Sequence, residues 1–177
     1  MPLAICRICI YKQRYLSNSF AFNQINIKMQ GTDIYLHFKG NSQEAFSFYK
    51  SIFGGQFITA QRFKDVPGGE KMSKNNQEKM MHISLKISPY TTLMATDMME
   101  NEENELKFGN NFHICLQADN EKEANKLFQS LSKDGRIEMP MNKTFWGAYF
   151  GMCQDRFGIL WMINYTFPQN NINESTK

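Results

Sequence analysis

Two segments of the chain have apolar residues spaced for one face of a helix. They are residues 41–55 and 120–135, and each ends in glycine. Each also begins with Asn and carries Glu three positions later, which is the arrangement of a capping box. The apolar positions are Ala45, Phe46, Tyr49, Ile52 and Phe53 in the first segment, and Ala124, Leu127, Phe128 and Leu131 in the second. The pattern predicts two amphipathic helices, capped by Asn41 and Asn120.

Short apolar runs that alternate or are rich in β-branched and aromatic residues predict strands around these helices. One run precedes each helix, and three follow it. The predicted strands lie in 32–40, 55–63, 79–87, 91–98, 110–119, 136–142, 147–153 and 159–166. The order strand, helix, strand, strand, strand therefore occurs twice. We expect an α+β fold of two paired βαβββ modules, about 32–99 and about 110–166, whose curved sheet surrounds a cleft.

The two helical segments are related by a constant offset in the sequence. Glu44 and Glu123 give 123 − 44 = 79, and Ala45 and Ala124 give the same difference. Together with the matching order of the flanking strands, this offset indicates an internal repeat.

Composition and charge narrow the classes of function. The 177 residues are 42% hydrophobic and 14% aromatic, which suits one domain with a sizeable core. The formal net charge is only +3 and the basic residues are scattered, so neither a nucleic acid nor a membrane is expected as a partner. No apolar run approaches the ~20 residues that span a bilayer.

The four cysteines predict no disulfide framework or zinc site. Cys6 and Cys9 form one C-x-x-C without a second pair, and Cys115 and Cys153 stand alone in apolar runs. We expect buried free thiols and a cytoplasmic location.

The two ends of the chain differ from the body. Residues 1–28 contain Arg and Lys but no acidic residue, and residues 167–177 are polar. We expect a poorly ordered leader or extension, a single domain over 29–166 and a frayed tail. For the leader, a transit peptide, an upstream extension and a true start at Met29 remain open.

The body resembles a known family in several strings as well as in its repeat. These are "YLHFKGNSQEAFSFYKSIFGG", "MMHISL", "LMATD" and, most specifically, "FWGAYFGMCQDRFGILWMIN". They are similar to the vicinal oxygen chelate superfamily, which includes glyoxalase I, extradiol dioxygenases and the bleomycin and fosfomycin resistance proteins. Within it they resemble the PhnB-like branch, also labelled demethylubiquinone methyltransferase-like. The resemblance implies a glyoxalase-like fold and a homodimer.

In metal-dependent members of that superfamily, the first and last strand of each module supply His or Glu ligands. Carried over here, the first-strand position of module two is His113, and the offset of 79 places its partner at Ile34. The last-strand positions are Met94 and Met162. A slip of one residue recruits His37 or Asp97 but gives no full ligand set. With His113 as the only retained ligand position, no cofactor is favoured, and a divalent metal is kept as an alternative.

Other polar residues in the body have structural interpretations. His82 is expected to bond to backbone within its strand, and His37 to lie on the helix-facing or outer side. Asp155 is expected to cap a hairpin turn with Gly158, and Asp97 to begin a loop.

The resulting hypothesis is a PhnB-like protein that binds a small organic ligand in an apolar cleft without the usual metal. The residues expected to line that cleft are His113, Met94, Met162, Trp146, Tyr149 and Phe150. The alternatives are a metal-dependent lyase or dioxygenase of the glyoxalase kind, and a resistance protein that sequesters a drug. Whether the protein catalyses a reaction is left open.

Overall fold

A computed structural model describes residues 32–168. The predicted leader, residues 1–28, and nearly all of the predicted tail lie outside the described residues, as do Cys6 and Cys9.

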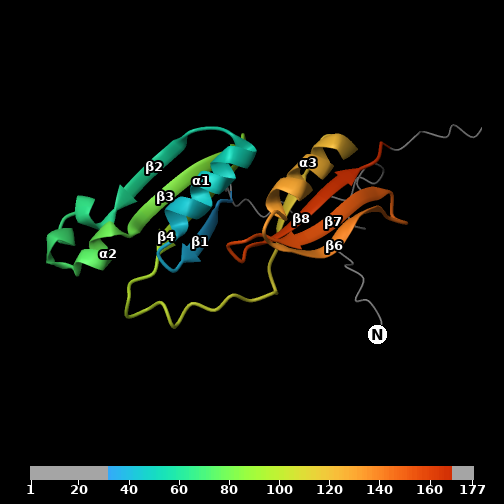
Figure 1. Cartoon of the computed structure of the whole chain (residues 1–177). Coiled ribbons are helices and arrows are strands. Elements are labelled where there is room, and N and C mark those ends of the chain that lie inside the picture. Colours follow the sequence, from blue (N-terminus) through green and yellow to red (C-terminus); the bar gives the residue numbers. More distant parts are fainter. Residues whose placement is uncertain (1–31, 169–177) are drawn as a thin grey trace, which may run out of the picture. The chain divides into compact units, whose positions relative to one another are not determined.

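The described chain forms two modules of the same topology (Figure 1). The first contains β1 (Ile34–Phe38), α1 (Ser42–Phe53), β2 (Phe57–Arg62), β3 (Met80–Ser88) and β4 (Thr91–Asp97). The second contains β5 (Ile114–Gln117), α3 (Glu121–Leu131), β6 (Arg136–Lys143), β7 (Ala148–Gln154) and β8 (Leu160–Thr166). The strand orders are β1-β4-β3-β2 and β5-β8-β7-β6. The predicted α+β fold of two βαβββ modules is confirmed.

In each sheet the first strand runs parallel to the last, and the other pairs are antiparallel. A parallel pair needs a crossover connection, and the helix of each module belongs to that connection. The helix therefore lies across one face of its own sheet (Figure 1).

The segment between β2 and β3 contains short helices where the sequence suggested only a loop. They are η2 (Phe63–Asp65), η3 (Gly69–Lys71) and α2 (Lys74–Glu78). Ser73 caps α2, because its side chain accepts from the Asn76 backbone N–H at 3.2 Å.

Alternation along the strands gives each sheet two different faces. Leu93 and Ala95 of β4, and Trp161 and Ile163 of β8, are fully buried in the core beside the helices. The residues between them point to the opposite side, which we call the open face. The open face of module one carries Tyr35, His37, His82, Ser84, Met94 and Thr96, and that of module two carries Cys115, Gln117, Phe150, Met152, Met162 and Asn164.

The hydrophobic core continues from one module into the other. The ring of Tyr49 on α1 packs edge-on against Trp161 on β8, with centroids 5.6 Å apart. Phe48 lies at the same distance from Phe157, in the turn between β7 and β8. The Tyr49 hydroxyl donates to Asp155 Oδ2 at 2.8 Å, so a polar contact also joins the modules.

The two helix N-termini are capped differently, although their sequences predict the same cap. Asn120 accepts from the Glu123 backbone N–H at 2.9 Å, as predicted. The Asn41 side chain makes no capping bond; Asp97 Oδ1 accepts from the Ser42 N–H instead, at 3.0 Å. Asp97 Oδ2 also accepts from the Met80 N–H, at 2.8 Å. Asp97 is the last residue of β4, so it stands where a loop begins, as predicted, but it is only 3% exposed and also caps α1.

Candidate site on the open sheet faces

The strand pairing corrects the register of the repeat. Tyr35 pairs with Met94, and Cys115 pairs with Met162. If Met94 and Met162 are equivalent, the last strands differ by 162 − 94 = 68 and the first strands by 115 − 35 = 80. Side chains alternate between the two faces along a strand. An odd offset such as 79 would therefore match a residue on the helix-covered face of one module with a residue on the open face of the other.

The corrected offset changes the counterpart of His113. Ile34 alternates with Tyr35 and packs against the core, so it is not the equivalent residue. Subtracting 80 from 113 gives Asp33, whose Oδ1 accepts from the Thr92 N–H at 3.2 Å. The helices keep the offset of 79 because α1 begins 42 − 35 = 7 residues after Tyr35, whereas α3 begins 121 − 115 = 6 residues after Cys115.

A histidine–carboxylate contact joins the two edges of the second sheet. His113 Nε2 lies 3.2 Å from Glu138 Oε2, and Arg136 Nη2 lies 2.6 Å from the other oxygen of Glu138. His113 comes just before β5, and Glu138 is the extra residue of a bulge in β6. These strands are three spacings apart, roughly 14 Å in a flat sheet, so the sheet must curve for the side chains to meet.

Apolar side chains form the middle of this open face. Met162 of β8 pairs with Met152 of β7, and Phe150 of β7 pairs with Asn164 of β8. The Trp146 ring, from the β6–β7 connection, lies edge-on to Phe150 with centroids 6.2 Å apart. Thioether and aromatic groups of this kind favour a flat or adaptable organic ligand.

The structure separates the six residues that were predicted to line the site. Phe150, Met162 and Trp146 come together in module two, and His113 belongs to the same sheet face. Met94 occupies the equivalent open face of module one. Tyr149 points to the helix-covered side, where its hydroxyl donates to Asn125 Oδ1 of α3 at 3.0 Å. Its ring packs against the core between the sheet and α3.

Module one places an aromatic cluster on its own open face. The Tyr35 hydroxyl lies 3.4 Å from His82 Nδ1, and the Tyr35 ring is 5.5 Å from the His37 ring. His37 is therefore exposed on the open face and not on the helix-facing side, and the contact that the structure shows for the His82 side chain is with Tyr35. The alternation of Ile34, Leu36 and Phe38 in the sequence was the signal that His37 lies opposite the helix.

The two described cysteines differ in exposure. Cys115 is exposed on the open face, so the expectation that it is buried is wrong. Cys153 is buried on the helix-covered side, and burial, with Asp155 and Glu138 adding to it, raises the pKa of its thiol to about 12. A thiol with that pKa stays protonated at neutral pH and is a poor nucleophile.

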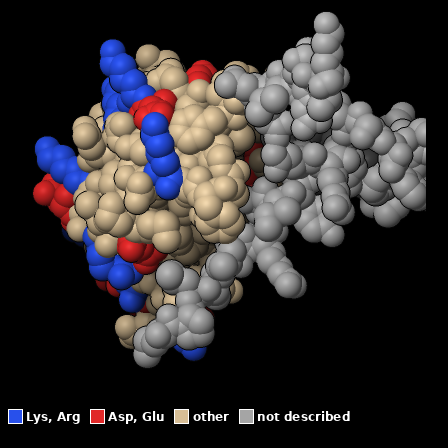
Figure 2. Space-filling model, turned by 90° about the vertical axis from the view of Figure 1, so that its right-hand side faces the viewer, with Lys and Arg blue, Asp and Glu red and all other residues tan. Residues whose placement is uncertain are grey.

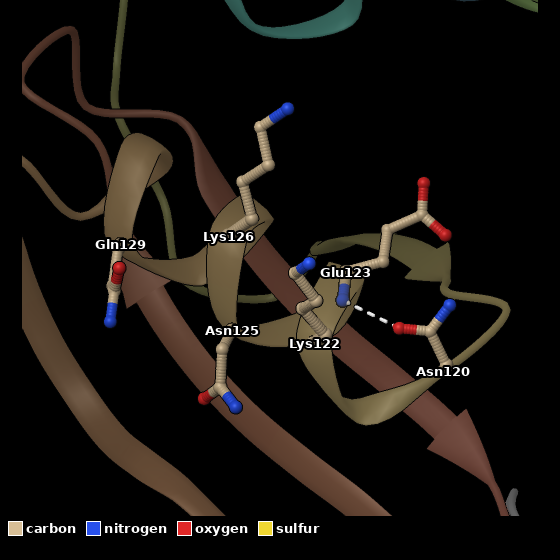
Figure 3. Close-up of a pocket in the computed structure, with 6 residues that line it drawn as sticks. All are labelled: Asn120, Lys122, Glu123, Asn125, Lys126 and Gln129. Atoms are coloured by element: carbon tan, nitrogen blue, oxygen red, sulfur yellow. Dashed lines mark hydrogen bonds between the residues drawn. The ribbon is translucent and has the colours of Figure 1, made fainter.

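A depression on the outer side of α3 has a different character (Figure 3). Its volume is about 730 Å³, and it is lined by Asn120, Lys122, Glu123, Asn125, Lys126 and Gln129. All six residues are of polar type, and they come from the cap Asn120 and from α3 as far as Gln129. Sites for small organic ligands usually have apolar walls, so we place the candidate site on the open faces.

Charged side chains are mixed by sign on the visible side of the second module (Figure 2). Lys and Arg lie beside Asp and Glu, next to an area of uncharged residues. Ion pairs in the described part of the chain include Lys143–Glu121 and Arg156–Glu44. Within residues 32–168, no helix is long and apolar enough to cross a membrane.

Comparison with known proteins agrees with this geometry. The family model of the Glyoxalase/Bleomycin resistance protein/Dioxygenase superfamily matches residues 33–163. Protein YjdN of Escherichia coli K12 is 28% identical over 143 residues, covering 76% of this chain and 95% of that protein.

Two solved structures share the fold. Protein PA1353 of Pseudomonas aeruginosa has a TM-score of 0.66 and 34% identity, covering 78% of this chain and 98% of the other. A Bacillus cereus protein titled putative 3-demethylubiquinone-9 3-methyltransferase, PhnB protein, has a TM-score of 0.62 and 22% identity, covering 77% and 100%. The chain therefore belongs to the Glyoxalase/Bleomycin resistance protein/Dioxygenase superfamily.

Proposed function

We propose that the protein binds a small organic ligand on the open face of its second module, without the divalent metal of its metal-dependent relatives. One observation carries this proposal. Phe150, Met152 and Met162 share the open face of module two with Trp146 and with the His113–Glu138 contact. Such a surface offers stacking and adaptable packing along its middle and a polar contact at one end.

The donor atoms at the family's ligand positions do not fit a hard divalent cation. The four positions are Asp33, Met94, His113 and Met162, which supply one carboxylate, one imidazole and two thioethers. Thioether sulfur suits soft ions such as Cu(I), whereas Mg²⁺, Mn²⁺ and Fe²⁺ need oxygen and nitrogen donors. Among residues 32–168, no three His, Cys, Asp or Glu side chains are grouped so that they could hold a metal ion.

One observation favours the metal-dependent alternative. The corrected register places a carboxylate, Asp33, where the sequence alone suggested isoleucine, so each module has one hard donor at its first strand. Two donors leave half of a tetrahedral or larger ligand set unfilled, and for that reason metal-free binding is the preferred function.

The proposal is tested by a thermal-shift screen of small aromatic and aliphatic compounds in the presence of a chelator. A compound at a hundred times its dissociation constant adds about 2.7 kcal/mol to the stability of the folded state. We expect such shifts with the chelator present, and we expect Met162→Lys to abolish them because it places a charge in the apolar surface. Lys126→Ala, on the outer side of α3, is the matched control and should keep them.

The metal content of the purified protein distinguishes ligand binding without metal from the metal-dependent alternative. The proposal fails if the purified protein holds a stoichiometric divalent metal that is lost in His113→Ala and whose removal abolishes every ligand-induced shift. Retention of the shifts in a metal-free preparation supports binding without metal.

A further inference from the structure

Two buried polar atoms on the open face of module two have no hydrogen-bond partner within the described residues. One is Oδ1 of Asn164, a residue that is only 6% exposed, and the other is Nε1 of Trp146. The amide nitrogen of Asn164 is fully used, because it donates to Gln117 Oε1 at 2.8 Å and to Thr166 Oγ1 at 3.1 Å. Most buried polar atoms in proteins are paired, so an unpaired acceptor and an unpaired donor in one region point to a ligand.

The two atoms flank the same aromatic side chain. Phe150 pairs with Asn164 across β7 and β8, which puts their side chains next to each other on the open face. The Trp146 ring approaches Phe150 at an interplanar angle of 66°. The unpaired acceptor and the unpaired donor thus belong to two residues that both neighbour Phe150.

The equivalent position in module one lacks this feature. Subtracting the last-strand offset of 68 from 164 gives Thr96. Its hydroxyl donates to the Met80 carbonyl at 3.3 Å. The unpaired acceptor is thus particular to module two and is not a consequence of the repeated architecture.

We infer that this end of the open face recognises a neutral carboxamide or lactam group attached to an apolar body. An indole N–H can only donate and an amide oxygen can only accept, so the ligand must present both an acceptor oxygen and an N–H, and a carboxamide supplies the two. A carboxylate has no proton for Asn164 Oδ1, and its charge would be desolvated beside Phe150 and Met162. This inference rests on the proposed function, and it adds the chemical class of the ligand.

The test uses three matched probes: benzamide, methyl benzoate and benzoate. They share one ring, and only benzamide carries both the acceptor and the donor. Ligand-observed NMR titration of the whole protein is expected to rank benzamide tightest. We expect methyl benzoate to bind about 3- to 10-fold more weakly, which corresponds to one neutral hydrogen bond, and benzoate more weakly still.

Two variants assign the contacts separately. Asn164→Leu should weaken benzamide by about 3- to 10-fold and leave methyl benzoate unchanged, because the ester has no proton to donate. Trp146→Phe keeps a ring and removes the N–H, so it should weaken both probes. Thr96→Val is the matched control and should change neither. If Asn164→Leu does not fold, Trp146→Phe together with the probe ranking still tests the inference.

The results separate this inference from the function on which it rests. Equal binding of benzamide and methyl benzoate to the native protein, or unchanged benzamide binding in both variants, overturns the carboxamide site and leaves the apolar surface standing. If none of the three probes binds while other compounds shift the melting temperature in a manner sensitive to Met162→Lys, the inference alone fails. If no compound binds in either experiment, both proposals fail.

Discussion

At the scale of single residues, Asp155 shows how a local signal acquires a long-range role. The sequence predicts an aspartate that caps the β7–β8 turn, and Asp155 Oδ1 does accept from the Phe157 and Ile159 backbone N–H groups at 2.9 and 3.0 Å. Its other oxygen accepts from Trp161 Nε1 and from the Tyr49 hydroxyl, both at 2.8 Å. Nothing in the sequence near Asp155 indicates the contact with Tyr49, which lies 106 positions away.

Burial raises the pKa of Asp155, and its four hydrogen bonds oppose that rise. The stabilising contribution of a carboxyl whose pKa is raised on folding is fully present below the unfolded pKa. It is lost as the pH rises through the folded pKa.

Tyr49→Phe is expected to destabilise the protein by about 1.5–3 kcal/mol at neutral pH, because it removes a hydrogen bond to a charged group. It also removes an interaction that lowers the pKa of Asp155, so that pKa should rise further. The deficit relative to the native protein should therefore shrink as the pH falls and Asp155 becomes neutral. Urea unfolding between pH 3 and pH 8 measures both effects.

The matched control is Tyr149→Phe, whose hydroxyl donates to the neutral side chain of Asn125. Its cost should be about 0.5–1.5 kcal/mol and independent of pH over that range. A Tyr49→Phe deficit that does not change with pH would show that Asp155 does not titrate as its surroundings require.

At the scale of elements, hydrophobic periodicity predicted the two long helices and all eight strands. The short helices between β2 and β3 were missed because they have no apolar periodicity and depend on local caps such as Ser73. The register of the repeat was off by one because the helix offset was applied to the strands. Only strand pairing shows that α1 begins one residue further from Tyr35 than α3 does from Cys115.

The unequal caps of α1 and α3 predict unequal effects of similar mutations. Asn120→Ala should cost about 1 kcal/mol of stability, as loss of an N-cap usually does. Asn41→Ala should cost less than about 0.5 kcal/mol, since its side chain makes no capping bond. Asp97→Ala should cost about 2–3 kcal/mol or more, because it leaves the Ser42 and Met80 N–H groups buried without an acceptor.

Chemical denaturation of the three variants gives these differences directly. The assignment of the α1 cap to Asp97 is contradicted if Asn41→Ala costs as much as Asn120→Ala.

At the scale of the whole molecule, the oligomeric state stays a prediction. Family resemblance implies a homodimer, and large apolar side chains such as Phe112 and Phe145 are 61% and 81% exposed. Light scattering coupled to size exclusion should give twice the chain mass of 20.7 kDa over micromolar concentrations. A mass equal to one chain across that range would contradict the prediction.

The sequence by itself determined the two modules, their α+β class and their family, because hydrophobic periodicity and turn residues act locally and occur twice. It also indicated that this chain has methionines at the last-strand positions where metal-dependent relatives have metal ligands. Tertiary structure decided which side chains share an open face, since alternation and register depend on partners far away in the chain. The position of Tyr149 beneath α3, the contact of His113 with Glu138 and the unpaired atoms of Asn164 and Trp146 all follow from that packing.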